Sequence, residues 1–440
     1  MNYSDQYQLV RNLIILITIA LVSCTPLATS TNTSTPNAPI KRISFENRTY
    51  EREIQTVLLH QPIGVNDFQP LSDVVSIDRQ NLILEFDDLV QDNETYNAKI
   101  IHCNANWTPS GLSSMDYLQE YNQFPINNYD YSFDTRTSYV HYTFPIPPVK
   151  VPGNYMVIVY RESDEKDIIL TRRFMVFDKR VVISGNSNFE NLIAHTFSSQ
   201  QINFRVDYSN FELINPMESI TSVLRQNARW DNTITFSSPT FAREGQSILE
   251  YRTFEKDENF RPGNEFRFFD LRSLNFPGQN VANIDRQAKP PIAHLAYDVP
   301  RTGLAFSQYQ DNNGRFNIQN LDRGNGQLEG DYVNVNFILK TEKPVNGKVY
   351  VAGGFNGWNL DNGNRMRYDD QLSAYRTSIL MKQGFYDFQY VVDSDTTSID
   401  VYEGSHFQTE NEYEILIYYF SPSLRADLLI GYLTFINNGR

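Results

Sequence analysis

Alternating apolar and polar side chains run through most of the chain from about Ile43 onward. Such period-two alternation is typical of half-buried β-strands, and here the strands recur about every ten residues. No long stretch has the 3.6-residue periodicity of a helix, although 115–121 is a candidate for one short helix. One predicted strand has Tyr129, Tyr131 and Phe133 on one face. Another has Ile202, Phe204, Val206 and Tyr208 on one face. The pattern predicts an all-β chain of tandem Ig-like or fibronectin-III-like β-sandwich domains.

Turn-forming sequences separate the predicted strands and divide the chain. "SDEKD" at 163–167 and "DNNG" at 311–314 are typical of hairpin turns. Changes of pattern near 177–188 and at the glycine-rich segment 320–331 mark domain boundaries. The predicted organisation is a signal peptide at 1–23, a lipidated cysteine and tether at 24–42, and sandwiches at 43–180, 181–328 and 329–440.

The N-terminus has the pattern of a lipoprotein signal. The apolar run 13–22 is too short to span a bilayer, which takes about 20 residues. Arg11 precedes the run, and Ser23 and Cys24 follow it as a predicted cleavage junction. We therefore expect Cys24 to become the first mature residue and to carry acyl chains, with an ordinary secretory signal as the alternative. Two or three acyl chains anchor a protein stably to a membrane.

Composition excludes some classes of partner. Segment 25–40 is rich in Thr, Ser, Pro and Asn and has no charge, which predicts a flexible tether. The formal net charge of −14 argues against nucleic acid, because phosphate binding needs clustered Lys and Arg. With Cys24 lipidated, Cys103 has no partner for an intramolecular disulfide. Stability must then come from burial of apolar side chains, including 27 Tyr and 29 Phe.

Motifs for catalysis or metal binding are missing from the sequence. The six histidines are scattered, and His102 and Cys103, being neighbours on a strand, should face opposite ways, one inside and one outside. Neither a nucleophile elbow nor a phosphate-binding loop is present. Carboxylates gather at Glu85, Asp87 and Asp88, but a shared cleft cannot be inferred from spacing. We expect no enzyme activity, no cofactor and no metal site.

"VYVAGGFNGWNL" at 349–360, with the hairpin that follows, resembles Ig-like modules of the glycogen- and starch-binding family. Phe355 and Trp358 fit the first part of that motif, whereas Tyr375 and Gln389 stand where those modules have a second tryptophan and a lysine. The resemblance implies an early-set fold for the last domain and names Phe355, Trp358 and Tyr375 as candidate carbohydrate contacts. The alternative is that Phe355 and Trp358 pack the edge of the sandwich.

Four further strings resemble the type IX secretion system plug protein family in consistent order. They are "IIHCNANWTPSGLSSMDYLQEYNQFPINNYDYSF" at 101–133, "RQNARWDNTI" at 225–234, "NEFRFFDLRSLNF" at 264–276 and "EGSHFQTENEYEILIYYFSPSLRADLLIGYL" at 403–433. The resemblance covers about 43–436 and implies a string of sandwiches that stops the periplasmic mouth of the secretion barrel. It names no catalytic residues, and leaves open whether Trp107, Arg229, Trp230 and Arg267 contact the barrel or serve structure.

The leading hypothesis is a non-enzymatic lipoprotein on the periplasmic face of the outer membrane that plugs the type IX translocon. Residues 25–29, after Cys24, hold no acidic side chain, unlike surface-exported lipoproteins of bacteria with this system, which favours the periplasmic face. Partners would be the translocon barrel and outer-membrane lipid. The alternatives are a glycan-binding outer-membrane lipoprotein acting through Phe355–Trp358, and an enzyme with an unrecognised cleft.

Overall fold

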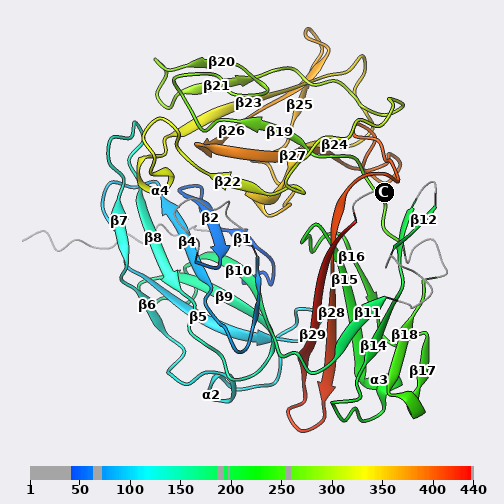
Figure 1. Cartoon of the computed structure of the whole chain (residues 1–440). Coiled ribbons are helices and arrows are strands. Elements are labelled where there is room, and N and C mark those ends of the chain that lie inside the picture. Colours follow the sequence, from blue (N-terminus) through cyan, green and yellow to red (C-terminus); the bar gives the residue numbers. More distant parts are fainter. Residues whose placement is uncertain (1–40, 63–71, 186–192, 197–198, 254–258, 438–440) are drawn as a thin grey trace, which may run out of the picture. The chain divides into compact units, whose positions relative to one another are not determined.

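The computed structural model describes residues 41–62, 72–185, 193–196, 199–253 and 259–437. Strands dominate these residues (Figure 1), as the alternation predicts. The helices are single turns: α2 (Ser114–Tyr117), α3 (Pro216–Ser219), α4 (Gly326–Glu329), and the 3-10 turns η1 (Glu244–Gln246) and η3 (Gly354–Asn356). Among the described residues, no helix has the length and hydropathy needed to cross a membrane. The all-β, multi-sandwich prediction is confirmed.

The first sandwich is formed by strands that follow one another in the first part of the chain. One sheet has the order β1-β10-β9-β5-β6, with β3 beside β10, and the other has the order β2-β4-β8-β7. Their bounds are β1 (Arg48–Thr49), β2 (Ile54–His60), β3 (Val74–Ser76), β4 (Ile83–Asp88), β5 (Tyr96–Cys103), β6 (Phe124–Ile126), β7 (Tyr129–Tyr131), β8 (Val140–Pro145), β9 (Gly153–Arg161) and β10 (Ile168–Phe177). Phe86 of β4 stacks on Tyr142 of the neighbouring β8 with ring centroids 5.0 Å apart, and Tyr96 of β5 in the facing sheet packs edge-on against Tyr142. Aromatic packing thus contributes to the contact between the two sheets.

The second sandwich combines strands from two distant parts of the chain. Its sheets are β11-β14-β18-β17 and β16-β15-β28-β29, and β12 and β13 form a separate pair. Their bounds are β11 (Val182–Gly185), β12 (Ile193–Thr196), β13 (Ser199–Ile202), β14 (Phe204–Asp207), β15 (Ile220–Gln226), β16 (Thr233–Phe236), β17 (Phe241–Arg243), β18 (Ile248–Tyr251), β28 (Asn411–Ser421) and β29 (Ala426–Asn437). The core between the two sheets contains Leu249 and Ile415. This core is therefore complete only when β28 and β29 have joined the sheet.

The third sandwich lies between these two parts in sequence. Its sheets are β20-β21-β23-β26-β25 and β19-β27-β22, with β24 also paired to β27. Their bounds are β19 (Arg267–Asp270), β20 (Val281–Asp285), β21 (Ile292–Leu295), β22 (Phe316–Ile318), β23 (Tyr332–Lys340), β24 (Lys348–Ala352), β25 (Arg367–Asp369), β26 (Ala374–Lys382) and β27 (Gly384–Asp393). Phe269, Phe337 and Phe388 meet at the centre of its core.

Strand pairing crosses the boundary that we predicted at residues 328 and 329. Strands β19 to β22, from the predicted second domain, pair with β23 and β27 of the predicted third domain or with each other. Strand β28, from the predicted third domain, pairs with β15 over seven residue pairs and lies beside it in Figure 1. The third sandwich is thus inserted into the second. Alternation identifies a strand but not its partner, so the sequence pattern misplaced this boundary.

The prediction that one of His102 and Cys103 faces solvent is wrong. The two side chains do point to opposite faces of β5, but His102 is 1% exposed and Cys103 is fully buried. His102 packs edge-on against Tyr155 on the core side of the sheet, with ring centroids 5.0 Å apart. Cys103 lies in a second apolar cluster on the other side. This sheet is covered on both faces, because the second sandwich packs against it.

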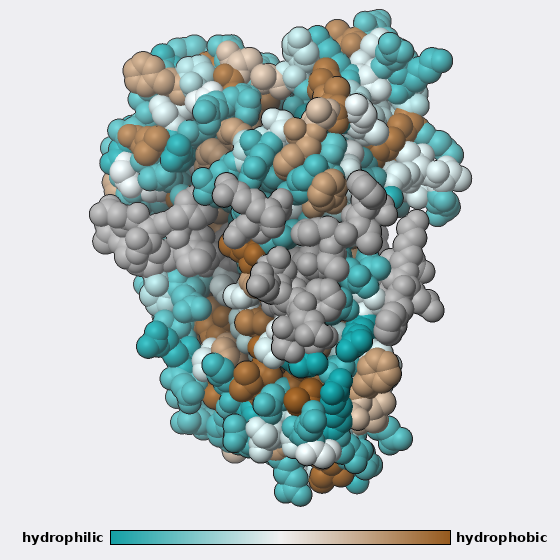
Figure 2. Space-filling model, turned by 45° about the vertical axis from the view of Figure 1, so that its right-hand side comes forward, coloured by the Kyte–Doolittle hydropathy of each residue, from teal (hydrophilic) through white to brown (hydrophobic). Residues whose placement is uncertain are grey.

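The visible surface is mostly hydrophilic. Figure 2 shows brown residues in small groups separated by teal ones. Tyr121 and Phe276 are the most exposed large apolar side chains of the described residues, at 80% and 77%. Scattered exposed apolar residues are normal for a folded protein, and the acidic composition keeps such a surface soluble.

A substitution in β28 should test whether this strand forms part of the core of the second sandwich. Ile415→Ala removes a fully buried side chain and should lower the free energy of unfolding by about 2 to 5 kcal/mol. Ile436→Ala, at a position 52% exposed on the neighbouring β29, should change it by less than about 0.5 kcal/mol. Urea denaturation measures both. Equal effects of the two variants would contradict the role of β28 in this core.

Candidate functional site: the junction of the sandwiches

The first and second sandwiches meet through an apolar cluster. Met156 and Ile158 of β9 face outward from the first sandwich, and Val223 of β15 and Leu416 of β28 face them from the second. These four side chains are at most 3% exposed. Burial of apolar area on this scale contributes about 1.5 to 3 kcal/mol per large side chain, so the two sandwiches are joined as firmly as the layers of one core.

Arg225 carries the main ionic contact of this interface. Its side chain is fully buried, and its Nη1 and Nη2 donate to the two oxygens of Asp73 at 2.8 Å. Its Nε and Nη2 also donate to Glu414 at 2.7 and 2.9 Å. Burial opposes the charged form, yet the two carboxylates outweigh it and raise the pKa of Arg225. One guanidinium therefore links the first sandwich, through Asp73, to two strands of the second.

Aromatic rings and guanidinium groups continue the contact. Trp107 of the first sandwich meets Trp230 of the second edge to face, with ring centroids 4.9 Å apart. The guanidinium of Arg173 lies 4.4 Å from the Trp107 ring centre and 5.2 Å from that of Trp230. Arg225 lies 4.7 Å from the Trp230 ring on its own sandwich. Cation–π contacts of partly buried groups contribute about 0.5 to 2 kcal/mol each.

Trp358 makes the corresponding contact between the second and third sandwiches. Arg229 lies 3.9 Å from the centre of its ring, and Phe266 packs beside it. Gly314 allows the ring to approach, because a Cβ there would come within 2.6 Å of Trp358 and because its φ of +80° favours glycine. We use the name junction for these contacts, formed by Asp73, Trp107, Arg173, Arg225, Arg229, Trp230 and Trp358. The junction contains all three tryptophans of the chain.

The first and third sandwiches are joined by a buried polar network. Lys382 of β26 donates to Asp87 of β4 at 2.6 Å, and both side chains are 1% exposed. The hydroxyl of Tyr332 donates to the same carboxylate at 2.6 Å, and His141 lies 2.7 Å from its other oxygen. Burial opposes ionisation of Asp87, but Lys382 and His141 outweigh it and keep the pKa of Asp87 below its usual value.

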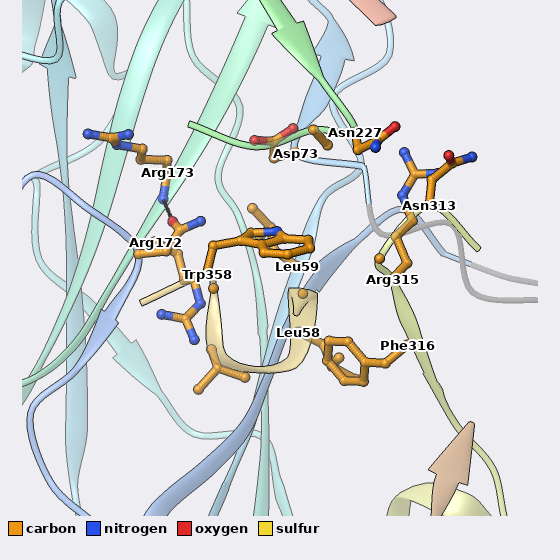
Figure 3. Close-up of a pocket in the computed structure, with 16 residues that line it drawn as sticks. Leu58, Leu59, Asp73, Arg172, Arg173, Asn227, Asn313, Arg315, Phe316 and Trp358 are labelled. Carbon is orange, nitrogen blue, oxygen red and sulfur yellow. Dashed lines mark hydrogen bonds between the residues drawn. The ribbon is translucent and has the colours of Figure 1, made fainter. Parts of the chain in front are cut away.

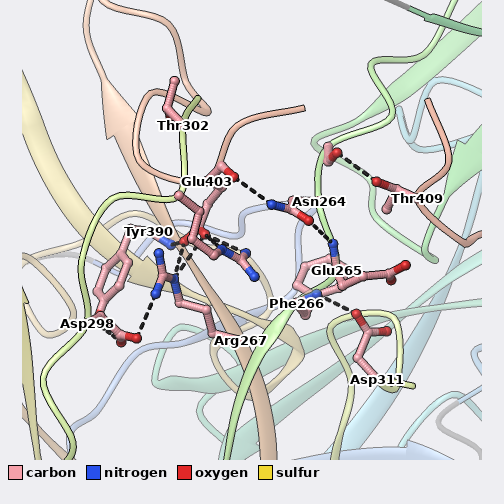
Figure 4. A network of polar contacts seen from close by, with 12 residues as sticks. Asn264, Glu265, Phe266, Arg267, Asp298, Thr302, Asp311, Tyr390, Glu403 and Thr409 are labelled. Atoms are coloured by element: carbon pink, nitrogen blue, oxygen red, sulfur yellow. Dashed lines mark hydrogen bonds and ion pairs between the residues drawn. The ribbon is translucent and has the colours of Figure 1, made fainter. Parts of the chain in front are cut away.

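Two chain segments that lie side by side connect the second and third sandwiches. We call them the crossover segments, residues 259–266 and 394–410. Figure 4 shows Glu403 at the centre of their contacts. Arg267 donates to both Glu403 oxygens at 3.0 Å, Arg301 donates to one at 2.6 Å, and the backbone of Tyr390 donates to the other at 2.8 Å. These donors offset the burial of Glu403 and lower its pKa. The return segment is thereby fixed to the third sandwich.

Three further carboxyl groups near the crossover segments have raised pKa values, which favour their protonated forms. Burial and the neighbouring Asp311 raise the pKa of Asp387 to about 8. Burial and the same neighbour raise the pKa of Glu265 to about 8, and burial raises that of Asp311 to about 6. In the part of the chain described, no group of three or more His, Cys, Asp or Glu side chains is arranged to hold a metal ion. The backbone N–H groups of Phe266 and Asn312 donate to Asp311 and Asp387, so these acids connect neighbouring segments.

The three candidate carbohydrate contacts occupy different environments. Trp358 lies in the junction with Arg229 over its ring, and Phe355 packs edge-on against Tyr386 of the third core. Tyr375 is 4% exposed, and its hydroxyl accepts a hydrogen bond from the backbone of Val345. These are the contacts of packing residues. Ser23 and Cys24 lie outside the described residues.

The residues named through the plug resemblance lie at the contacts between sandwiches. Trp107, Arg229 and Trp230 belong to the junction, and Arg267 fixes the return segment. Sequence reasoning missed Arg225 and Lys382. A signal for Arg225 was present, because it is in phase with buried Val223 on the same strand. An apolar face that contains a charge indicates a buried ion pair, although not its partner.

Comparison with known proteins agrees with this architecture. Residues 54–178 match the family model described as type 9 secretion system plug protein 1st domain. The chain carries a plug-protein first domain. The resemblance seen in the sequence is confirmed, and the protein has a role associated with type IX secretion in the cell envelope. The matched residues include nearly all of the first sandwich.

A solved structure is similar over almost the whole chain. It is the crystal structure of a hypothetical protein from Parabacteroides merdae ATCC 43184 at 2.30 Å resolution. The two are 28% identical with a TM-score of 0.81, and the match covers 90% of this chain and 100% of that chain. No curated protein matches the chain. This chain and that protein therefore share the arrangement of sandwiches described above.

Loss of Arg225 should lower the stability of the protein. Arg225→Ala leaves Asp73 and Glu414 without their shared partner, and we expect the free energy of unfolding to fall by about 3 to 5 kcal/mol. Arg376→Ala removes an ion pair with Asp369 whose arginine side chain is 53% exposed, and should cost about 1 kcal/mol or less. Chemical denaturation of both variants measures the difference. A cost for Arg225→Ala as small as that of the control would contradict its bridging role.

The buried acid Asp387 should make stability depend on pH. Its raised pKa means that the folded state holds a proton that the unfolded state has released, so this contribution is complete below about pH 4 and is lost as pH rises through about 8. Asp387→Asn removes the contribution. The stability of the variant relative to the unmodified protein should therefore increase between pH 5 and pH 9, measured by thermal unfolding across that range. Asp395→Asn, at an exposed position, should show no such trend.

Proposed function

We propose that this protein closes the periplasmic opening of the type IX translocon barrel by binding it when no cargo is engaged. The observation that carries the proposal is the match of residues 54–178 to a plug-protein first domain. The proposed role is binding, without catalysis. We assign the protein to the periplasmic face of the outer membrane, held by acylated Cys24, and its partners are the barrel and membrane lipid.

The junction supports this role on physical grounds. A stopper must present a fixed surface, because any ordering of its parts during docking subtracts from the binding free energy. Here the first sandwich is joined to the second by Arg225 and to the third by Lys382, and both side chains are buried. The ring of Trp358 links the remaining pair. The plug domain is thus held by contacts on two sides.

The proposed anchor explains how a displaced plug returns. Two or more acyl chains on Cys24 would keep the protein at the membrane, and segment 25–40 would allow it to reach a nearby opening. Tethering raises the effective concentration of a partner to the millimolar range, so rebinding needs only modest intrinsic affinity. The predicted signal and tether are consistent with such a mechanism.

Deletion and complementation would test the proposal. A strain lacking the protein should admit a large antibiotic that the outer membrane normally excludes, and affinity purification of the intact protein should recover the barrel. Complementation with Cys24→Ala should leave the protein out of the membrane fraction and restore the permeability barrier only in part. Ser34→Ala, in the same tether, should complement fully.

Two results would contradict the proposal separately. An impermeable deletion strain from which no barrel is recovered would remove the plugging role. Full activity and membrane association of Cys24→Ala would leave plugging intact and remove the lipid anchor.

A further inference from the structure

A small cavity of about 120 Å³ lies beside the junction, between the first sandwich and the loops that carry Gly314 and Trp358. Figure 3 shows Arg172 and Arg173 on one side of Trp358 and Arg315 with Asn227 on the other. Its apolar floor includes Leu58. Three arginines line the cavity, whereas Asp73 is the one carboxylate among the described residues that line it.

The charges around the cavity do not balance within the described residues. Asp73 is bound by Arg225 at 2.8 Å, and Arg315 is bound by Glu412 at 2.8 Å. Arg172 donates to the backbone carbonyl of Thr171 at 2.9 Å. The ranges described contain no carboxylate within ion-pair distance of Arg172.

Arg173 adds a second positive charge, and among the described residues it makes no ion pair, although the charges of Glu46 and Asp73 favour its charged form. Its Nε donates to the carbonyl of Phe45 at 2.7 Å, and its guanidinium faces the rings of Trp107 and Trp230. The cavity thus adjoins two guanidinium groups that make no ion pair among the described residues, and for Arg172 no charged neighbour offsets burial.

An unbalanced guanidinium in a half-buried position is costly. Removing a cation from water without an opposite charge is unfavourable, and proteins normally pair such groups or let them bind a ligand. Burial lowers the pKa of Arg172 to about 10, with no compensating carboxylate. The planar fork of a guanidinium matches phosphate and carboxylate oxygens in two parallel hydrogen bonds.

We propose that this cavity binds a small oxyanion, a phosphate or a carboxylate group, through the guanidinium of Arg172. The anion would supply the negative charge that the described side chains around Arg172 lack. The volume of about 120 Å³ limits the bound part to one such group, either free or at the end of a larger molecule. The site is independent of the proposed plugging role.

Binding should be visible as stabilisation of the full chain. At constant ionic strength, replacing chloride with inorganic phosphate or acetate should raise the thermal unfolding midpoint, because a ligand that binds only the folded state stabilises it by mass action. Isothermal titration with each anion gives the affinity directly. A phosphate monoester, glycerol 3-phosphate, distinguishes the sources: binding comparable to inorganic phosphate indicates a group presented by a larger molecule, and weaker binding indicates the free anion.

Variants locate the site. Arg172→Gln should weaken anion binding by about tenfold or more, the loss expected for hydrogen bonds to a charged group, while its unfolding midpoint in chloride is equal to or above that of the unmodified protein. Arg172→Lys keeps the charge but not the fork, and should bind with intermediate affinity. Arg367→Gln, at an exposed arginine of β25, should bind normally.

The result that overturns the proposal is a stabilisation no larger with phosphate and acetate than with chloride. Anion binding that Arg172→Gln leaves unchanged would also overturn it. If Arg172→Gln does not fold, the comparison of Arg172→Lys with Arg367→Gln decides the location in the same titration.

Discussion

The buried guanidinium of Arg225 is the constraint on which the arrangement of the sandwiches depends. It holds Asp73 and Glu414 at the same time, and leaving the buried carboxylate of Glu414 without its ionic partner would cost several kcal/mol. Asp73 precedes β3 in the first sandwich, and Glu414 lies on β28, so the ion pairs admit one relative position of the two sandwiches. The apolar cluster around Met156 and Leu416 stabilises the contact, and the ion pairs fix the relative orientation of the two sandwiches. Together they convert separate domains into one fixed body.

The insertion of the third sandwich into the second adds a topological constraint. The chain leaves the second sandwich after β18 and returns at β28, and the outgoing and returning segments are bonded to each other through Gly263, His406 and Thr409. Two adjacent connections restrict rotation far more than one linker does. Glu403, held by Arg267 and Arg301, fixes the return. The third sandwich is thus tied to the second at its base and to the first through Lys382.

Particular residues show what the sequence could and could not predict. Alternation identified strands but not their limits: Phe204 and Val206 share a face of β14, whereas Ile202 belongs to β13, although all three side chains enter one core. It did not identify partners: Arg225 and its two acids are 152 and 189 residues apart, and no local pattern records such a distance. It also assumed that each sheet has one face in water, which fails for His102 and Cys103. The aromatic motif around Trp358 was visible, but the position of Arg229 over its ring is a contact with another sandwich. Residues before 41 were interpreted from sequence alone.

The return of β28 and β29 to the second sandwich has a consequence for the order in which the protein matures. During synthesis, β11, β14, β17 and β18 emerge early, yet the sheet that covers their apolar face lacks two of its four strands until β28 and β29 are made. The third sandwich can close first, because all its strands lie between the two parts. Until the last hairpin arrives, the half-built second sandwich exposes a sheet edge on β15 that other chains can pair with. Synthesis of β28 and β29 therefore covers the exposed edge of β15 and supplies Glu414 to Arg225 in the same step.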